Sequence, residues 1–267
     1  MITESFVRWA GGKSWLVPHI KKLIAPIQIN HYHEPFLGGA ATFFALDLPR
    51  RSYLSDVNDD LINAYLQIKE SPEEVIQRLD GFQNTKDEYY RVRSMHFTDN
   101  IERAAQFIFL NQTSYNGLYR VNRKGEYNVP YGNREEWHYD ADRIRRCSKK
   151  LYNTRITCGD FEINKYRIKH NDLVFLDPPY TVSHNNNGFI EYNKNLFSIK
   201  DQKRLSLFID FIKRRGAFYI LTNANHEAIQ MIFQKGDRKI ILERNSLIGG
   251  KEAKRGKTSE LIFTNIR

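Results

Sequence analysis

An apolar run that stops at a carboxylate and two prolines is the feature that most constrains this chain. Leu173-Val174-Phe175-Leu176 contains no polar residue, which is typical of a strand buried on both faces of a parallel sheet. Asp177-Pro178-Pro179-Tyr180 follows at once, and the strand must end there because proline has no N–H to donate to a ladder. The sequence therefore predicts an α/β fold with Asp177 at the carboxyl end of a buried strand, where open α/β sheets bind their ligands.

Residues 177–180 offer groups that suit a flat nucleobase carrying an exocyclic amino group. The Asp177 carboxylate and a nearby backbone carbonyl can accept the two amino protons, and the Tyr180 ring can stack on the base. The alternative is a plain turn that closes a strand, with Asp177 as a cap, since so short a motif also arises by chance. Its position directly after a buried strand favours the binding site.

A second unit with α/β character lies between residues 32 and 68. Its segments in order are a strand end with a Gly-rich turn, a helix start, a short strand and a helix, at residues 33–39, 40–46, 51–54 and 59–68. This order matches the front half of a nucleotide-binding unit, in which glycines admit a ligand close to the backbone. Asp56, at the end of the short strand, suits a ribose hydroxyl, and it suits a cap of the following helix equally well.

The residues between these two units look helical. Ser71-Pro72 is a favourable helix start, residues 101–110 have the helical spacing of apolar side chains, and no alternating strand pattern occurs from 70 to 112. Beyond Tyr180 the α/β pattern returns, with a helix expected at 201–212 and strands at 218–221, 239–242 and 260–263. The chain therefore predicts an α/β sheet domain that carries an inserted, mainly helical block.

Composition sets outer limits on function. The net charge is +10, and residues 147–267 carry 22 basic and 12 acidic side chains, whereas residues 58–146 carry 13 and 15. A basic chain permits a polyanionic partner without identifying one. Two cysteines cannot form a disulfide framework or a zinc site, and the eight histidines lack metal-ligand spacing, so no metal is expected. No apolar run approaches the roughly 20 residues of a membrane span and no signal peptide is visible, so we expect a cytoplasmic protein without membrane contact.

A third motif lies near the N-terminus. Arg8-Trp9-Ala10-Gly11-Gly12-Lys13 lacks the spacing of a phosphate-binding loop and alone would be a turn. In chain order, however, Trp-Ala-Gly-Gly-Lys, the Pro-Phe-Leu-Gly-Gly turn, Ser-Asp-Val-Asn and Asp-Pro-Pro-Tyr together resemble the Dam-type DNA adenine-N6 methyltransferases of the D12 class, over nearly the whole chain. The resemblance implies a Rossmann-like methyltransferase domain that binds S-adenosyl-L-methionine, residues 1–57 and 147–267, with an inserted, mainly helical target-recognition domain, residues 58–146.

The same resemblance implies roles for individual residues. The catalytic positions are Asp177, Pro178, Pro179 and Tyr180. The positions that bind the cofactor, S-adenosyl-L-methionine, are Trp9, Lys13, Phe36, Gly38, Asp56, Asp160, Phe161 and Asp177, with Asp160-Phe161 at the adenine end. The turn departs from the usual Phe-x-Gly-x-Gly pattern at its fifth residue, Ala40, and we expect a methyl group there to be tolerated at some cost in cofactor affinity.

Residues 115–132, YNGLYRVNRKGEYNVPYG, resemble the target-recognition loop of the members that methylate GATC. This likeness implies that Tyr115 and Asn116 lie at the flipped base, that Leu118, Arg120 and Pro130 read base edges, and that Arg8 lies near the outer guanine. The chemistry agrees, since arginine is the usual reader of guanine, an apolar side chain suits the thymine methyl group, and an aromatic ring can stack where a base has left. After Gly132 the likeness fades, and the plain alternative is an exposed loop rich in Asn and Gly.

These observations predict an enzyme that methylates N6 of a flipped adenine in double-stranded DNA, within GATC. An RNA base-amino methyltransferase is a second hypothesis, because Asp-Pro-Pro-Tyr suits any exocyclic amine, and a non-catalytic DNA-binding module on the same fold is a third. A protein partner cannot be inferred. We expect the basic C-terminal part, including residues 251–257, to hold the phosphates, and the near-neutral insert to supply specificity.

Overall fold

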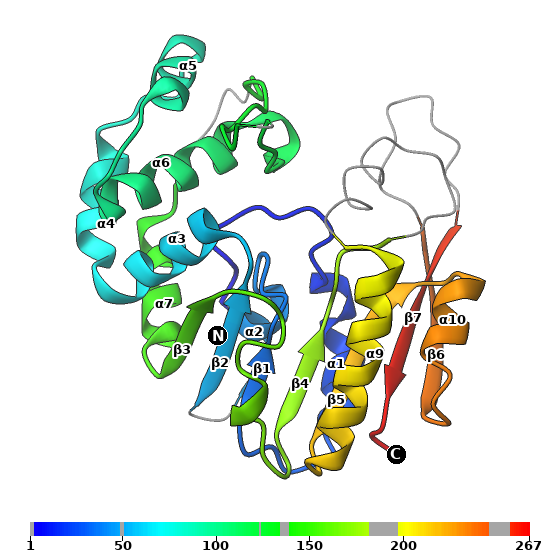
Figure 1. Cartoon of the computed structure of the whole chain (residues 1–267). Coiled ribbons are helices and arrows are strands. Elements are labelled where there is room, and N and C mark those ends of the chain that lie inside the picture. The colour runs from blue at the N-terminus through cyan, green and yellow to red at the C-terminus, as the bar shows by residue number, and fades with distance from the viewer. Residues whose placement is uncertain (1–2, 49–50, 123, 134–138, 182–196, 246–256) are drawn as a thin grey trace.

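The computed structural model describes residues 3–48, 51–122, 124–133, 139–181, 197–245 and 257–267. Within them, seven strands form one sheet in the order β3-β2-β1-β4-β5-β7-β6 (Figure 1). Their bounds are β1 Tyr32–Glu34, β2 Ser52–Asp56, β3 Thr154–Cys158, β4 Leu173–Leu176, β5 Phe218–Ala224, β6 Arg238–Asn245 and β7 Lys257–Thr264. Among these strands, β7 alone points in the opposite direction to the other six, because it pairs antiparallel with both β5 and β6. The mostly parallel α/β sheet that the apolar run predicts is therefore confirmed.

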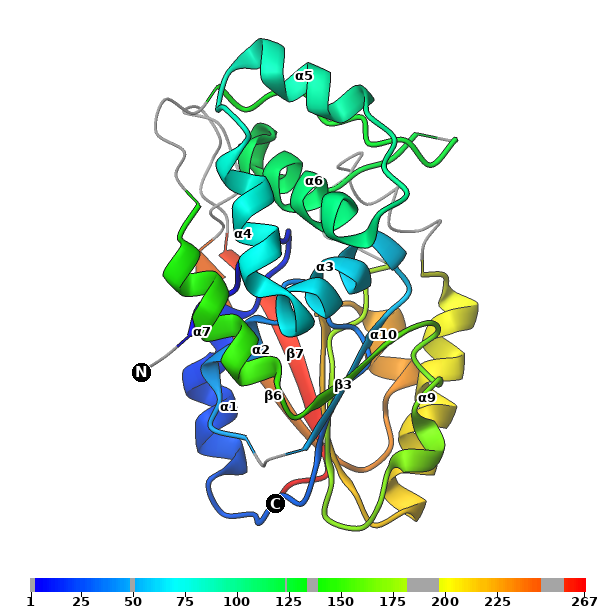
Figure 2. The ribbon, with the colours of Figure 1, turned by 90° about the vertical axis from the view of Figure 1, so that its left-hand side faces the viewer.

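The side chains of β4 alternate between two hydrophobic cores on opposite faces of the sheet. Leu173 and Phe175 join the core that contains side chains of α1, α2 and α7, and Val174 and Leu176 join the core of α9 and α10 (Figure 2). These helices span Val17–Ile24, Ala41–Ala45, Ala141–Leu151, Ile199–Arg214 and Glu227–Ile232. Because helices cover both faces, every position of β4 is buried, which explains why the run contains no polar residue.

Parallel pairing brings the ends of β1, β2, β3 and β4 to one edge of the sheet, which we call the carboxyl edge. Tyr32 of β1 pairs with Ser52 of β2 on one side and with Leu173 of β4 on the other, and Asp56 pairs with Cys158 of β3. The segments that leave these strand ends therefore lie next to one another along the carboxyl edge.

Four helices stand above the β2 and β3 end of the carboxyl edge (Figure 1). They are α3 Asp59–Glu70, α4 Pro72–Asp80, α5 Lys86–Ser94 and α6 Asn100–Thr113, and together we call them the helical block. Asn58 caps α3 by accepting a hydrogen bond from the Leu61 N–H. The Ser71 side chain, expected to cap α4, makes no cap hydrogen bond, because Ser71 also closes α3 and donates its own N–H to the Gln67 carbonyl.

The helical block shares a hydrophobic core with the sheet. Leu61 of α3 and Phe109 of α6 belong to the same core as Phe175 of β4. The boundary expected between residues 146 and 147 falls inside α7, which is one continuous helix. The division of the chain into a catalytic and a recognition domain stays a prediction. In the described part of the chain, no helix is long and apolar enough to cross a membrane.

Candidate active site

Asp177 is the first residue beyond β4, and two side chains contact its carboxylate. Thr222 of β5 donates its hydroxyl to Asp177 Oδ1 at 2.6 Å, and Lys13 Nζ lies 3.2 Å from the same oxygen. Burial raises the pKa of Asp177 above its ordinary value, and the nearby Lys13 ammonium and the Thr222 hydrogen bond oppose that rise. The pKa of this carboxylate is therefore raised overall by burial, and these two neighbours limit the rise.

Tyr180 is fixed at both its hydroxyl group and its ring. The hydroxyl donates to Glu260 Oε2 at 2.8 Å, and Lys13 Nζ lies 4.7 Å from the ring centroid. Glu260 belongs to β7 and is only 5% exposed, and its Oε2 is 3.7 Å from Lys13 Nζ. A single lysine thus lies within 4 Å of the buried Glu260 and the partly buried Asp177 carboxylate, and over the ring of the candidate base-stacking tyrosine.

Thr222 and Glu260 were not identified from the sequence as site residues. The first lies on β5, which pairs directly with β4, and the second lies on β7, which pairs with β5. Thr222 and Glu260 lie near Asp177 because of the order of the strands in the sheet. No sequence motif in the C-terminal strands predicts that order. Of the two prolines between Asp177 and Tyr180, Pro178 is buried and Pro179 is partly exposed.

The Gly-rich turn after β1 packs tightly against Trp9. A side chain on Gly38, where φ is +45°, would place its Cβ 2.9 Å from Trp9 Cδ1, and a Cβ on Gly39 would lie 2.9 Å from Trp9 Cβ. Ala40 has a φ of 51°, in the left-handed region that favours glycine. Ala40 thus carries a cost in backbone conformation, and the expected cost in cofactor affinity stays a prediction.

Asp56 ties this turn to the end of β2. Its Oδ2 accepts the Gly38 N–H at 2.9 Å, and its Oδ1 accepts the Asn58 N–H at 3.0 Å. The cap of α3 is Asn58, so the alternative reading of Asp56 as that cap is wrong. Because a carboxylate offers about four acceptor positions, these two bonds leave capacity for a ribose hydroxyl, and that role stays a prediction.

The ends of β1 and β3 meet through aromatic rings. Phe36 and Phe161 stack with centroids 5.4 Å apart, and the Arg204 guanidinium of α9 lies 4.7 Å from the Phe161 ring centroid. Arg204 also pairs with Asp160 through two hydrogen bonds, of 2.9 and 3.3 Å. Phe161 is only 3% exposed, so at the adenine end it is Asp160 and the partly exposed Phe36 that remain accessible.

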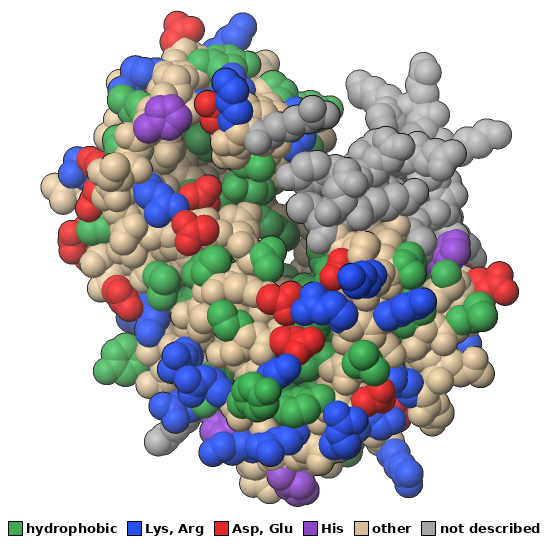
Figure 3. Space-filling view, viewed as in Figure 1, with side chains coloured by type: hydrophobic (Ala, Val, Ile, Leu, Met, Phe, Trp, Pro, Cys, Tyr) green, Lys and Arg blue, Asp and Glu red, His purple; other side chains and the backbone are tan. Residues whose placement is uncertain are grey.

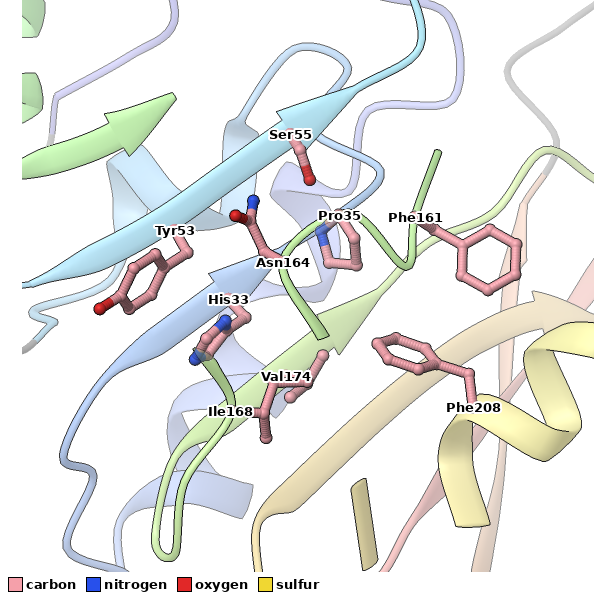
Figure 4. A pocket seen from close by; sticks show the side chains of 9 residues that line it. All are labelled: His33, Pro35, Tyr53, Ser55, Phe161, Asn164, Ile168, Val174 and Phe208. Carbon is pink, nitrogen blue, oxygen red and sulfur yellow. The ribbon is translucent and has the colours of Figure 1, made fainter. Parts of the chain in front are cut away.

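A small pocket lies behind Phe161 (Figure 4). It is lined by His33, Pro35, Tyr53, Ser55, Phe161, Asn164, Ile168, Val174 and Phe208. Its volume is about 10 Å³, comparable with the space that one water molecule needs. A nucleobase cannot enter such a space, so an adenine at this edge of the sheet must lie outside Phe161 rather than behind it.

The residues expected to read DNA lie together on a loop that follows α6. Tyr115 donates its N–H to the Pro130 carbonyl at 2.9 Å, so the two arms of the loop run side by side. Tyr115 is 54% exposed, Asn116 beside it has a φ of 54°, and Leu118 is partly exposed. The Arg120 guanidinium is held by Asn128, through Nε to Oδ1 at 2.7 Å.

Arg8 approaches the start of this loop from the N-terminal segment. A Cβ on Gly117 would lie 2.7 Å from Arg8 Cβ, so only glycine fits there. Figure 3 shows that the molecular surface is hollowed between the helical block and the carboxyl edge of the sheet. Residues 134–137, where the likeness to the family has faded, and the basic residues 251–256, which we expect to hold phosphates, lie outside the described residues. Within the described part, no group of three or more His, Cys, Asp or Glu is placed to hold a metal ion.

Glu34, at the end of β1, is a fully buried acid beside the site. Its Oε2 accepts the Tyr32 hydroxyl at 2.8 Å. Burial raises the pKa of Glu34 from its ordinary value of 4.5 to about 8, and the charge of Asp177 adds to the rise. Glu34 therefore carries its proton in the folded protein at neutral pH.

We expect this proton to make stability depend on pH. Between about pH 5 and 8 the folded chain keeps a proton that the unfolded chain has released, so the free energy of unfolding falls as pH rises, by up to about 1.4 kcal/mol per pH unit. Glu34→Gln should remove this contribution, because glutamine accepts the Tyr32 bond without titrating. Urea denaturation of both proteins across this range measures the two slopes, and equal slopes would contradict the assignment.

Comparison with known proteins places this site in a family. The profile of the D12 class N6 adenine-specific DNA methyltransferases matches residues 9–247. Type II methyltransferase M1.LlaDCHI of Lactococcus lactis subsp. cremoris is 36% identical over 97% of this chain and 94% of its own length. Type II methyltransferase M.MjaIII of Methanocaldococcus jannaschii is 34% identical over 99% of this chain and its full length. The DNA adenine methylase of Escherichia coli strain K12 is 28% identical, covering 97% and 94%.

The matched family and the relatives define an enzyme that methylates adenine in DNA. The chain belongs to the D12 class of N6 adenine-specific DNA methyltransferases. The prediction of an enzyme of DNA adenine methylation is confirmed at this level, and membership implies a methyl donor and a DNA substrate.

Proposed function

We propose that this chain transfers a methyl group from S-adenosyl-L-methionine to N6 of adenine in double-stranded DNA, within the sequence GATC. The observation that carries the proposal is the position of Asp177 at the end of β4. There its carboxylate is held by Thr222 and Lys13, and Tyr180 lies beside it with its hydroxyl fixed by Glu260.

The donor set at the carboxyl edge fits the cofactor. Asp56 is the last residue of β2 and Asp160 follows the neighbouring strand β3, and the Gly159 N–H donates to the Asp56 carbonyl at 2.8 Å, so the two residues lie at adjacent strand ends. Carboxylates suit the hydroxyl and amino groups of a nucleoside, and the partly exposed Phe36 suits its flat ring. Trp9 packs on Gly38 of the Gly-rich turn and Lys13 contacts Asp177, so these three residues form the rest of the proposed cofactor site. When bound, S-adenosyl-L-methionine supplies a methyl group already activated by its sulfonium charge.

The residues of the chain act on the adenine amino group. Its nitrogen is a poor nucleophile because the lone pair is delocalised into the ring. Asp177 and the Pro178 carbonyl accept hydrogen bonds from the two N6–H groups, favour tetrahedral geometry in which the lone pair leaves conjugation with the ring, and stabilise the positive charge that develops on nitrogen. After the transfer the nitrogen releases one proton, and S-adenosylhomocysteine is the second product. Tyr180 stacks on the base, which must leave the duplex to reach this pocket. Lys13 favours the ionised form of Asp177 and so opposes the rise in pKa that burial causes.

The loop after α6 supplies specificity in this proposal. Tyr115 and Asn116 lie at the place the base has left, and Leu118, Arg120, Pro130 and Arg8 contact base edges. Support comes from exposure and geometry, since Tyr115, Arg120 and Pro130 are exposed on one loop whose arms are joined by hydrogen bonds. The helical block that carries the loop acts as the recognition domain.

Expression in a methylation-free bacterial strain tests this proposal. The recovered DNA is digested with restriction enzymes that differ in their sensitivity to adenine methylation at GATC. We expect full protection against the enzyme blocked by methylation and full cleavage by the enzyme that requires it. Unprotected GATC sites in a strain that contains folded protein would count against the GATC assignment, and methylated adenine elsewhere would redirect it to another sequence.

A further inference from the structure

The N-terminal segment, residues 6–13, is hydrogen-bonded to the end of α6. Asn111, which is fully buried, accepts the Arg8 N–H with its Oδ1 at 2.7 Å and donates its Nδ2 to the Arg8 carbonyl at 2.7 Å. One side-chain amide therefore pairs with both backbone groups of one residue, as a neighbouring strand would. Gln112 adds a bond from its Nε2 to the Phe6 carbonyl at 2.6 Å. The position of this segment is thus set by the helical block.

The same amide also holds the beginning of the loop that carries the candidate DNA-reading residues. Asn111 Nδ2 lies 3.3 Å from the Gly117 carbonyl, so it contacts the N-terminal segment and the loop at once. Further along the loop, the ring of Tyr119 stacks on Trp9, with centroids 5.6 Å apart and planes at 23°. The loop and the N-terminal segment are therefore joined at two points.

The other side of the segment touches the candidate cofactor site. Trp9 packs so closely on Gly38 and Gly39 that neither position admits a side chain without a shift. Four residues later, Lys13 reaches the Asp177 carboxylate at 3.2 Å. Trp9 is accordingly in contact with the loop on one face and with the Gly-rich turn on the other.

We propose that residues 6–13 couple DNA binding to cofactor binding, with Asn111 as the positioning residue and the Trp9–Tyr119 stack as the contact that transmits the change. The inference rests on the proposed function, because it takes both ligands from it. DNA that orders the loop fixes Gly117 and Tyr119, and through Asn111 and Trp9 it fixes the Gly-rich turn in its cofactor-binding form. The two ligands then bind with positive cooperativity, and the coupling is reciprocal by linkage.

Isothermal titration of the whole chain measures this coupling. The probe is S-adenosylhomocysteine, which allows no turnover, and its Kd is measured alone and in the presence of a saturating GATC duplex. For the wild-type chain we expect the Kd to fall at least about fivefold when DNA is bound. The Kd of the duplex must fall by the same factor when S-adenosylhomocysteine is saturating.

Two substitutions and one matched control test the residues. Tyr119→Leu removes the ring that stacks on Trp9, whereas Tyr119→Phe keeps the ring and removes the hydroxyl, which lies 3.4 Å from Asp60. Asn111→Leu removes both bonds to Arg8. The coupling ratio is the Kd of S-adenosylhomocysteine without DNA divided by its Kd with the saturating duplex. We expect this ratio to fall to between one and two in Tyr119→Leu and Asn111→Leu, and to keep its wild-type value in Tyr119→Phe. At saturation of both ligands, kcat should fall less than kcat/KM for the cofactor.

A wild-type ratio of one would overturn the inference, as would equal ratios in folded Tyr119→Leu and Tyr119→Phe. If Asn111→Leu does not fold, the two Tyr119 variants decide alone. Failure of the proposed function would give a different result: the wild-type chain would show no methyl transfer or would not bind S-adenosylhomocysteine. A chain that methylates GATC with an unchanged ratio in Tyr119→Leu refutes only the coupling.

Discussion

Asp177→Ala is expected to lower the rate of methyl transfer by at least about a hundredfold, toward the detection limit, while the protein stays folded. Removing one preorganised electrostatic contact with a transition state costs about 10²–10³ in rate. The fold should survive because Lys13, which loses Asp177, still lies 3.7 Å from Glu260 and is not left as an unpaired buried charge. Tritiated methyl transfer to duplex DNA and circular dichroism of the purified variant measure both parts.

Thr222→Val is the matched control, because it leaves the Asp177 carboxylate in place and removes the hydroxyl that bonds it at 2.6 Å and the Leu176 carbonyl at 3.3 Å. That bond holds the pKa of Asp177 down, so its loss should move the acid limb of the pH–rate profile to higher pH, with less than about a tenfold loss at the optimum. Activity depends on the ionised carboxylate and falls as pH drops through this pKa. Near wild-type methylation by folded Asp177→Ala would show that the mechanism is wrong.

Arg120→Ala is expected to weaken binding to the recognition sequence by roughly 1–3 kcal/mol and to relax specificity at one base position. Arginine reads guanine with two hydrogen bonds, and the Arg120 guanidinium is presented on an exposed loop where Asn128 fixes its direction. Competition binding with duplexes that differ by one base pair measures both the loss and the position.

Arg145→Ala provides the control for charge. Arg145 lies on α7 and pairs with Glu73 and Asp142, so its removal takes away one positive charge without touching the loop. We expect its sequence preference to equal that of the wild-type chain. Asn128→Ala removes the side chain that holds the Arg120 guanidinium but leaves the guanidinium in place. This variant should lose less affinity for DNA than Arg120→Ala and keep the base preference. An unchanged preference in Arg120→Ala would remove Arg120 from the recognition residues.

The parts of the fold that depend on local sequence were predictable. The unbroken run 173–176 implied burial on both faces, and the prolines after Asp177 set the end of the strand; both features are present in the structure. The helices α6 and α9 follow from the spacing of their apolar residues, and strands at 218–221, 239–242 and 260–263 lie within β5, β6 and β7.

The parts that depend on contacts between distant segments were not predictable. Glu260 reaches Tyr180 only because β7 inserts beside β5, and no local pattern in β7 specifies that neighbour. Asn111 looked like an ordinary polar residue at a helix end, and its pairing with Arg8 spans 103 residues. The boundary expected after residue 146 is implied by the family resemblance and falls inside the continuous helix α7, and the division into two domains stays a prediction.

The central claim is that this chain methylates N6 of adenine in duplex DNA with Asp177 at the reacting nitrogen. Its most direct test is nucleoside analysis by mass spectrometry after reaction of the purified chain with S-adenosyl-L-methionine. Matched GATC-containing duplex DNA and RNA of the same sequence serve as substrates, with Asp177→Ala in parallel. The account predicts N6-methyl-2′-deoxyadenosine from the duplex DNA and the wild-type chain, none from the RNA, and at equal reaction times at least about a hundredfold less from the variant. Methylated cytosine, methylated RNA, or equal product from the variant would contradict it.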